Sequence, residues 1–182
     1  MGGKFDRQYA RNIRRRSAGQ FDGKWHLDEV VITMRGVKHW LWRAVDRDGF
    51  VLDVLVQSRR NTTAAKLLMR KLLKRQGSAR VMITDKLRSY GAAKREIMPD
   101  VEHRSHKGLN NRAENSHQPT RRRERIMKRF KSPRQLQRFV SIHDPIANLF
   151  HLPRHEMPSA SFREMRSLAM QIWSEVAEVS TA

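Results

Sequence analysis

The chain has 182 residues, of which 38 are Lys or Arg and 18 are Asp or Glu, and its formal net charge is +20. Its length is that of one domain with a hydrophobic core, and the absence of cysteine excludes a disulfide-stapled module and a thiolate metal site. No apolar run reaches the roughly 20 residues that a membrane helix needs, and no apolar signal core follows Met1, so we expect a cytoplasmic protein.

The first part of the chain predicts an arm followed by a β-meander. Residues 1–24 are basic and polar with little apolar periodicity, and we expect them to form an arm outside the folded core. Residues 27–34, 38–46 and 50–56 are rich in β-branched and aromatic side chains. Gly-containing turns separate them, and the Asp-Gly pair at 48–49 is a strong hairpin signal. Three strands in a meander are therefore predicted.

A helix, a buried strand, a second helix and a short strand are predicted next, over residues 61–76, 81–85, 89–97 and 101–104. Asn61 or Thr62 caps the first helix, and Gly77 ends it. The buried strand is a short apolar run that ends in Asp85. Such a run is typical of a parallel strand that is reached through a helical crossover.

The rest of the chain predicts helices. Residues 109–129 form a long helix that Pro119 kinks, and Ser132 and Gln135 form a capping box that opens another helix, with a bend at Pro145. Ser161 begins a second capping box ahead of a last amphipathic helix, whose apolar stripe is either a core face or an oligomer face.

This order of elements is that of a ribonuclease-H-like (retroviral-integrase-like) α/β fold, with a mixed five-stranded sheet, flanking helices and extra C-terminal helices. In that arrangement the first and fourth strands lie side by side at the centre of the sheet. Asp28 on the first strand and Asp85 at the end of the fourth would then be neighbours, and Glu114 on the late helix could reach the same point.

The positive charge is concentrated in two stretches that contain few acids. Residues 59–95 hold twelve Lys and Arg with Asp85 as the one acid, and residues 103–138 hold twelve with Glu114 and Glu124. A chain this basic indicates a polyanion as partner, and nucleic acid is the first candidate. Charge balance does not require acids that stand alone in such stretches, so Asp85 and Glu114 are candidate functional residues.

Three converging carboxylates would repel one another unless cations neutralised them. Carboxylate ligands suit Mg²⁺ or Mn²⁺, and two such ions can activate a hydroxyl group and stabilise the leaving oxygen of a phosphoryl transfer. Each acid taken alone is more often a turn or cap residue than a catalytic one. Glu29 should face away from Asp28, and Asp46, Asp48 and Asp53 belong to the hairpin, where we expect them to be solvated.

Basic side chains around these acids are candidates for binding DNA phosphates, with a solvated helix face as the alternative. They are Lys86, Arg88, Arg112, Arg121, Arg122, Arg123, Arg125, Lys128 and Arg129. His103, His106 and His117 lack regular metal-ligand spacing and are interpreted as polar or DNA-contacting residues rather than a zinc site. Asn110 and Asn111 favour a helix cap, and Trp40 and Trp42 favour packing on the sheet.

Five segments together resemble the DDE transposases of bacterial insertion sequences, in particular the insertion sequence six family. They are Trp25-His-Leu-Asp28-Glu, Trp42-Arg-Ala-Val-Asp46, Ser58-Arg-Arg-Asn61, Thr84-Asp85-Lys-Leu-Arg-Ser-Tyr90 and Asn110-Asn-Arg-Ala-Glu114-Asn-Ser-His-Gln-Pro119. The resemblance implies that Asp28, Asp85 and Glu114 are the catalytic triad and bind two Mg²⁺ ions. Arg121 lies seven residues after Glu114, where the wider superfamily often has a basic residue.

The resemblance also implies an activity, partners and a division of the chain. Such enzymes cut DNA at terminal inverted repeats, join the 3′ ends to target DNA and work as homo-oligomers, which implies a nucleoid-associated protein. Residues 25–131 would be the DDE catalytic core and 132–182 a C-terminal helical extension. Residues 1–24 resemble the connector after the family's N-terminal helix-turn-helix region, which this chain is expected to lack, and the gap from Asp85 to Glu114 is shorter than in many DDE transposases.

Two other functions are compatible with the charge. The chain could be a truncated, non-catalytic DNA-binding remnant that inhibits full-length transposase, or a basic RNA-binding or ribosome-associated protein. The RNA-binding alternative leaves the isolated acids unexplained.

Overall fold

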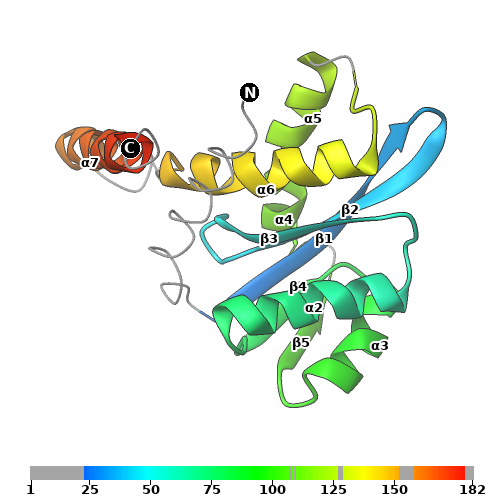
Figure 1. Cartoon of the computed structure of the whole chain (residues 1–182). Helices are drawn as coiled ribbons and strands as arrows, with labels where there is room; N and C mark the ends of the chain where they lie inside the picture. Colours follow the sequence, from blue (N-terminus) through cyan, green and yellow to red (C-terminus); the bar gives the residue numbers. More distant parts are fainter. Residues whose placement is uncertain (1–22, 107, 109, 127–128, 152–157, 179–182) are drawn as a thin grey trace. The chain divides into compact units, whose positions relative to one another are not determined.

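The computed structural model describes residues 23–178 except 107, 109, 127–128 and 152–157, so the arm predicted over 1–24 lies almost wholly outside the described residues. Two compact units are described separately, and the boundary between them falls after Val140, inside one helix. The unit that ends at Val140, called the first unit, contains the whole sheet (Figure 1), and the described residues from Ser141 onward belong to the second unit. None of the helices in the described ranges is long and apolar enough to cross a membrane.

The predicted meander is confirmed. Strands β1 (Lys24–Met34), β2 (Val37–Val45) and β3 (Val51–Gln57) pair antiparallel in sequence order. Arg35 and Gly36 join the first two strands, both with positive φ, which is the backbone of a two-residue turn that matches strand twist. The turn between β2 and β3 is closed by the Asp46 carboxylate, which accepts hydrogen bonds from the backbone N–H groups of Asp48 and Phe50 at 2.9 Å.

The predicted crossover elements are confirmed as well. Helix α2 (Thr62–Gln76) begins where the Asn61 side chain accepts a hydrogen bond from the backbone N–H of Ala64, and it ends at Gly77, whose φ of 75° suits glycine. Strand β4 (Val81–Thr84), helix α3 (Arg88–Ile97) and strand β5 (Glu102–Ser105) follow. β4 is parallel to both β1 and β5, so the sheet is mixed, with the order β3-β2-β1-β4-β5.

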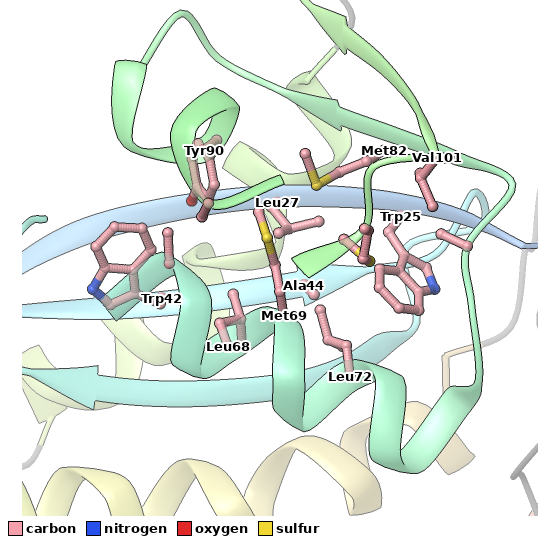
Figure 2. Packing of buried hydrophobic residues seen from close by; sticks show 14 of the residues in the cluster. Trp25, Leu27, Trp42, Ala44, Leu68, Met69, Leu72, Met82, Tyr90 and Val101 are labelled. Atoms are coloured by element: carbon pink, nitrogen blue, oxygen red, sulfur yellow. The ribbon is translucent and has the colours of Figure 1, made fainter. Parts of the chain in front are cut away.

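One face of the sheet packs against α2 and α3 (Figures 1 and 2). Trp25 and Leu27 of β1 point to this face, as alternate residues of a strand must, and they meet Leu68 and Met69 of α2. All four of these side chains are at most 1% exposed. Tyr90 of α3 joins the cluster with its ring edge against Trp42, at a centroid distance of 5.5 Å.

The other face of the sheet has its own apolar cluster. Val30 and Ile32 of β1 pack with Phe130 and with Leu136 and Val140 of helix α6 (Pro133–Leu149). The predicted cap of α6 is present: the Ser132 hydroxyl accepts a hydrogen bond from the backbone N–H of Gln135 at 3.1 Å. Two opposed clusters therefore fix the sheet from both sides, and with it the strand ends that carry the acids.

The prediction of one long helix over 109–129 is wrong in one respect, because the described residues of this segment form two helices. Helix α4 (Asn111–Ser116) ends before His117, and helix α5 (Gln118–Ile126) begins after it. Pro119 has no backbone N–H and its ring would clash with the carbonyl one turn back, so the chain restarts with proline in a first turn.

The prediction that Asp46 and Asp53 are solvated is also wrong, because they are 4% and 5% exposed, whereas Asp48 is exposed as expected. Asp53 lies opposite Ala44 on the face that α2 covers. There its carboxylate pairs with Lys71 at 2.9 Å and Arg75 at 2.7 Å. Lys71 and Arg75 belong to α2, and the sequence pattern of the hairpin does not show that this helix packs over Asp53.

In the second unit, helix α7 (Ser159–Glu178) begins two residues before the predicted cap Ser161. The backbone N–H of Phe162 already donates to the carbonyl of Pro158 at 3.0 Å, so Ser161 lies inside the helix. Met165 and Leu168 of the predicted apolar stripe are 43% and 51% exposed, so these two are not core residues.

The α2 packing can be tested with two neighbouring leucines. Leu68 is fully buried in the cluster, whereas Leu67 is 41% exposed. Leu68→Ala should lower the free energy of unfolding by about 2–5 kcal/mol, because a cavity replaces buried methyl groups. Leu67→Ala should change it by less than about 1 kcal/mol. Urea denaturation of both variants measures the difference, and equal losses would contradict the packing described.

Candidate active site

Asp28 and Asp85 lie side by side because of the register of the β1–β4 pair. Leu27 is the partner of Thr84 in this parallel ladder, and the two aspartates are the next residues on their chains. Their side chains are 14% and 25% exposed, so both carboxylates are partly withdrawn from water. The sequence prediction that these two acids are neighbours is confirmed.

The environment of Asp28 disfavours its negative charge. Burial, followed by repulsion from Asp85, raises the pKa of Asp28 to about 6, although the positive charges of Arg60 and Arg121 oppose that rise. Two acids are thus held together without enough positive charge to balance them. Such an arrangement can bind a cation or retain a proton at neutral pH.

Glu114 lies on α4, but its side chain is outside the described part of the structure. The backbone on either side of it is tied to β1. Before it, the buried Asn110 amide donates to the carbonyl oxygen of Leu27 at 2.8 Å, and after it the Nε2 atom of His117 lies 3.3 Å from Oδ2 of Asp28. No group of three His, Asp or Glu that could hold a metal ion occurs among the side chains that the structure describes.

Arg43 holds the junction of α4 and α5 over the same face of the sheet. It lies opposite Asp28 in the β1–β2 ladder and is 1% exposed. Its guanidinium group donates to the carbonyl oxygen of Ser116 and, at 2.7 Å, to the hydroxyl of Thr120. The end of α4 is therefore positioned from β2 as well as from β1.

Glu29 faces the other way, as predicted, and is part of a separate polar cluster. Its carboxylate accepts a hydrogen bond from the hydroxyl of Tyr90 at 2.6 Å and one from Nε of Arg60 at 2.7 Å. Burial raises the pKa of Glu29 to about 7, against these two hydrogen bonds, which lower it. Arg60 also lies with Nη2 3.6 Å from Oδ2 of Asp85, so it connects this cluster to the acid pair.

Asp85 is held in place by hydrogen bonds to both its side chain and its backbone carbonyl. Its Oδ1 atom accepts a hydrogen bond from the backbone N–H of Leu87 at 2.9 Å. Its carbonyl oxygen accepts one from the Ser105 hydroxyl at 2.8 Å and one from the Thr84 hydroxyl at 2.7 Å. His103 lies with Nε2 2.9 Å from the Thr84 hydroxyl, and burial lowers its pKa. The ends of β4 and β5 therefore hold the Asp85 backbone, and the backbone N–H of Leu87 at the start of α3 orients its carboxylate.

The candidate DNA-contacting residues divide into three groups. Lys86 and Arg88 are exposed just after Asp85. On α5 the exposed candidates are Arg121, Arg122, Arg123 and Arg125, and Arg129 is exposed after that helix. Lys128 and the side chain of Arg112 lie outside the described residues. Among the α5 arginines, Arg121 is the one whose charge is among the main influences on the pKa of Asp28, which it lowers.

Sequence reasoning gave no individual role to three residues that shape this region, namely Arg43, Arg60 and Tyr90, and it named His117 only as a polar or DNA-contacting residue. Arg60 differs from Arg59 only in where its side chain lies, and nothing in a basic run distinguishes the two. The position of His117 near the site could have been predicted, because it follows Glu114 by three residues and so lies about one helical turn away. Its contact with Asp28 accords with a polar role rather than a zinc site.

Residues 22–152 match the model of the DDE domain family of IS240-type transposases. The transposase of the insertion sequence-like element IS431mec from Staphylococcus aureus is 32% identical over 100 residues. The transposase of IS257 in transposon Tn4003, from the same species, has the same identity over the same length. The matched region is 52% of this chain and 44% of each relative, so the likeness spans less than half of those proteins.

A solved structure gives the same fold. A chain of the simian T-cell lymphotropic virus intasome in complex with the PP2A regulatory subunit B56 gamma superposes with a TM-score of 0.50 at 14% identity. The superposition covers 70% of this chain and 49% of that chain. The predicted ribonuclease-H-like architecture with a mixed five-stranded sheet is confirmed.

The raised pKa of Asp28 predicts how stability changes with pH in metal-free protein. The folded chain binds this proton more tightly than the unfolded chain, so Asp28 reduces stability as pH rises from about 4 to 6. Asp28→Asn removes that loss. Its free energy of unfolding should exceed that of wild type by an amount that grows between about pH 4 and pH 7, reaching on the order of 1–3 kcal/mol.

Urea denaturation at several pH values, with a chelator present, measures this difference. Asp100→Asn is a matched control, because Asp100 is an exposed acid outside the sheet. Its free energy of unfolding should stay within about 0.5 kcal/mol of that of wild type, as is usual for a surface substitution. A difference for Asp28→Asn that is constant from about pH 4 to pH 7 would show that Asp28 has no raised pKa.

Proposed function

The chain belongs to the DDE domain family of IS6-type insertion-sequence transposases, and we propose that it cleaves DNA at the ends of such an element and joins the 3′ ends to target DNA. The observation that supports this reaction best is the placement of Asp28 beside Asp85 on paired parallel strands. A solvated turn or cap role for either acid does not account for two partly buried carboxylates that repel each other.

We propose that Asp28, Asp85 and Glu114 hold the divalent metal of this reaction, as Mg²⁺ or Mn²⁺ and as two ions. The donor set fits, because the two described acids offer oxygen ligands whose negative charge is balanced only in part by nearby arginines. Glu114 would supply the third carboxylate from α4, whose start is tied to β1 beside Asp28. Bound ions of this kind activate an attacking hydroxyl and stabilise the leaving oxygen of a phosphoryl transfer.

The protein's own residues would position the DNA and the acids. Arg121 lies close enough to act on the charge of Asp28, so its guanidinium could bind a phosphate next to the reacting one. Lys86, Arg88 and the other exposed arginines of α5 would bind phosphates farther along the strand. His117 would keep Asp28 oriented, and Arg43 would keep α4 in place.

Further parts of the proposal follow from the reaction. Terminal inverted repeats and target DNA would be the partners, and a homo-oligomer would hold the two element ends together. Because such DNA lies in the bacterial nucleoid, the protein would be cytoplasmic and nucleoid-associated. Residues 25–131 would form the catalytic core, with 132–182 as a helical extension.

Asp85 provides a test of the proposed reaction. Asp85→Asn should reduce Mg²⁺-dependent strand transfer on element-end DNA to background, because a neutral amide is a poor ligand for the cation. Asp100→Asn, at an exposed position outside the site, should keep wild-type activity. Gel analysis of joined products from labelled element ends gives the measurement.

The outcomes separate the two functions. Loss of transfer in Asp85→Asn alone, with DNA binding retained, supports the transposase. Equal inactivity of wild type and variant, with DNA binding in both, would favour the non-catalytic DNA-binding role that inhibits full-length transposase.

The α5 arginines provide a second test. Arg121→Gln and Arg122→Gln remove the same charge from neighbouring exposed positions. Both should weaken DNA binding and reduce the slope of log affinity against log salt by about one. Strand transfer at saturating DNA should fall more in Arg121→Gln, because only a phosphate held near Asp28 affects the reacting geometry. Equal effects on transfer would contradict the role given to Arg121.

A further inference from the structure

Arg60 lies between two acids that belong to opposite faces of the sheet. Its Nε atom donates to Oε1 of Glu29 at 2.7 Å, and its Nη2 atom pairs with the same oxygen. That same Nη2 lies 3.6 Å from Oδ2 of Asp85. One guanidinium group therefore balances the charge of a buried acid and also acts on a proposed metal ligand.

Arg60 is held in place independently of Asp85. The Glu29 side chain is fully buried and is itself fixed by the Tyr90 hydroxyl at 2.6 Å. The guanidinium carbon also lies 5.1 Å from the centre of the Trp40 ring, in a cation–π arrangement. If the contact with Asp85 were lost, these groups would still keep the side chain at the edge of the site.

Asp85 is likewise held independently of Arg60. The backbone N–H of Leu87 orients one carboxylate oxygen, and the hydroxyls of Ser105 and Thr84 fix the carbonyl oxygen. The oxygen that Arg60 approaches is the other one, Oδ2. Removing Arg60 should therefore change the charge next to Asp85 without releasing the carboxylate from its position.

The geometry points to Arg60 as the counter-charge of Asp85 in the metal-free site, which a divalent cation displaces from Asp85 while Glu29 keeps the guanidinium beside it. This inference rests on the proposed function, because it takes Asp85 as a metal ligand. It makes Arg60 a positioning residue rather than a catalytic one. It also gives a signed consequence: Arg60 opposes metal binding, so neutralising it should increase the affinity for the cation.

Mn²⁺ binding to metal-free protein, measured by calorimetry or by the paramagnetic resonance of free Mn²⁺, tests that consequence. Arg60→Gln should tighten Mn²⁺ binding by roughly three- to tenfold, the range expected for a partly exposed charge next to the site. Arg60→Lys keeps the charge and should bind Mn²⁺ nearly as wild type does. Arg59→Gln removes the same charge from the adjacent exposed residue and should change the affinity by less than about twofold.

The results separate this inference from the function on which it rests. Asp85→Asn should lose most of the Mn²⁺ affinity, and wild-type protein that binds no Mn²⁺ would overturn both proposals. Wild-type binding that depends on Asp85 but is unchanged or weakened in Arg60→Gln would overturn the role of Arg60 alone.

A measurement on wild type covers the case in which Arg60→Gln does not fold. In crystals soaked with Mn²⁺, Arg60 should keep its hydrogen bond to Glu29 while Nη2 lies farther from Oδ2 of Asp85 than 3.6 Å. Mn²⁺ on Asp85 with Arg60 still at that distance would overturn the displacement.

Discussion

The parallel pairing of β1 with β4 is the constraint on which the site depends. The register that places Leu27 beside Thr84 leaves Asp28 and Asp85 as the next residues on neighbouring chains. A shift of one residue along β1 would exchange its two faces and bring Glu29 to the position of Asp28. The register is fixed by burial, since Trp25 and Leu27 must face α2 and α3 while Val30 and Ile32 face α6.

The fold holds two acids in an arrangement that they would not adopt alone. Burial and mutual repulsion raise the pKa of Asp28, and the charges of Arg60 and Arg121 offset this only in part. The two apolar clusters and the hydrogen bonds to the Asp85 backbone must supply the stability that keeps the acids in place. A site that binds a cation needs such uncompensated charge, because fully paired carboxylates would have little left to gain from a metal.

The accuracy of the sequence predictions follows the range of the interactions involved. Helix α2 was predicted with its cap and its end, since Asn61 and Gly77 act on backbone within one turn. The neighbouring positions of Asp28 and Asp85 were predictable because the order of elements restricts the topology. The burial of Asp53 was not, because its partners Lys71 and Arg75 are brought to it by packing.

The role of Arg60 in the site could not be predicted from the sequence either. Arg59 and Arg60 are chemically identical and adjacent, and only the tertiary position of Glu29 gives one of them a role in the site. The interruption at His117 was missed for a related reason. Pro119 predicts a kink, but the exact place of the break depends on tertiary contacts such as that of Arg43 with Ser116.

The adjacent acids of β1, Asp28 and Glu29, face opposite sides of the sheet and have different roles. Asp28 faces α4, where a metal and DNA would bind, whereas Glu29 faces α3 and is fully buried. Arg60 joins the two sides from the loop between β3 and α2, a loop whose position is set by the meander and by the cap at Asn61. The electrostatics at Asp85 therefore depend on residues that belong to the framework of the fold. A change in that loop would alter the charge at the site without touching any of the three acids.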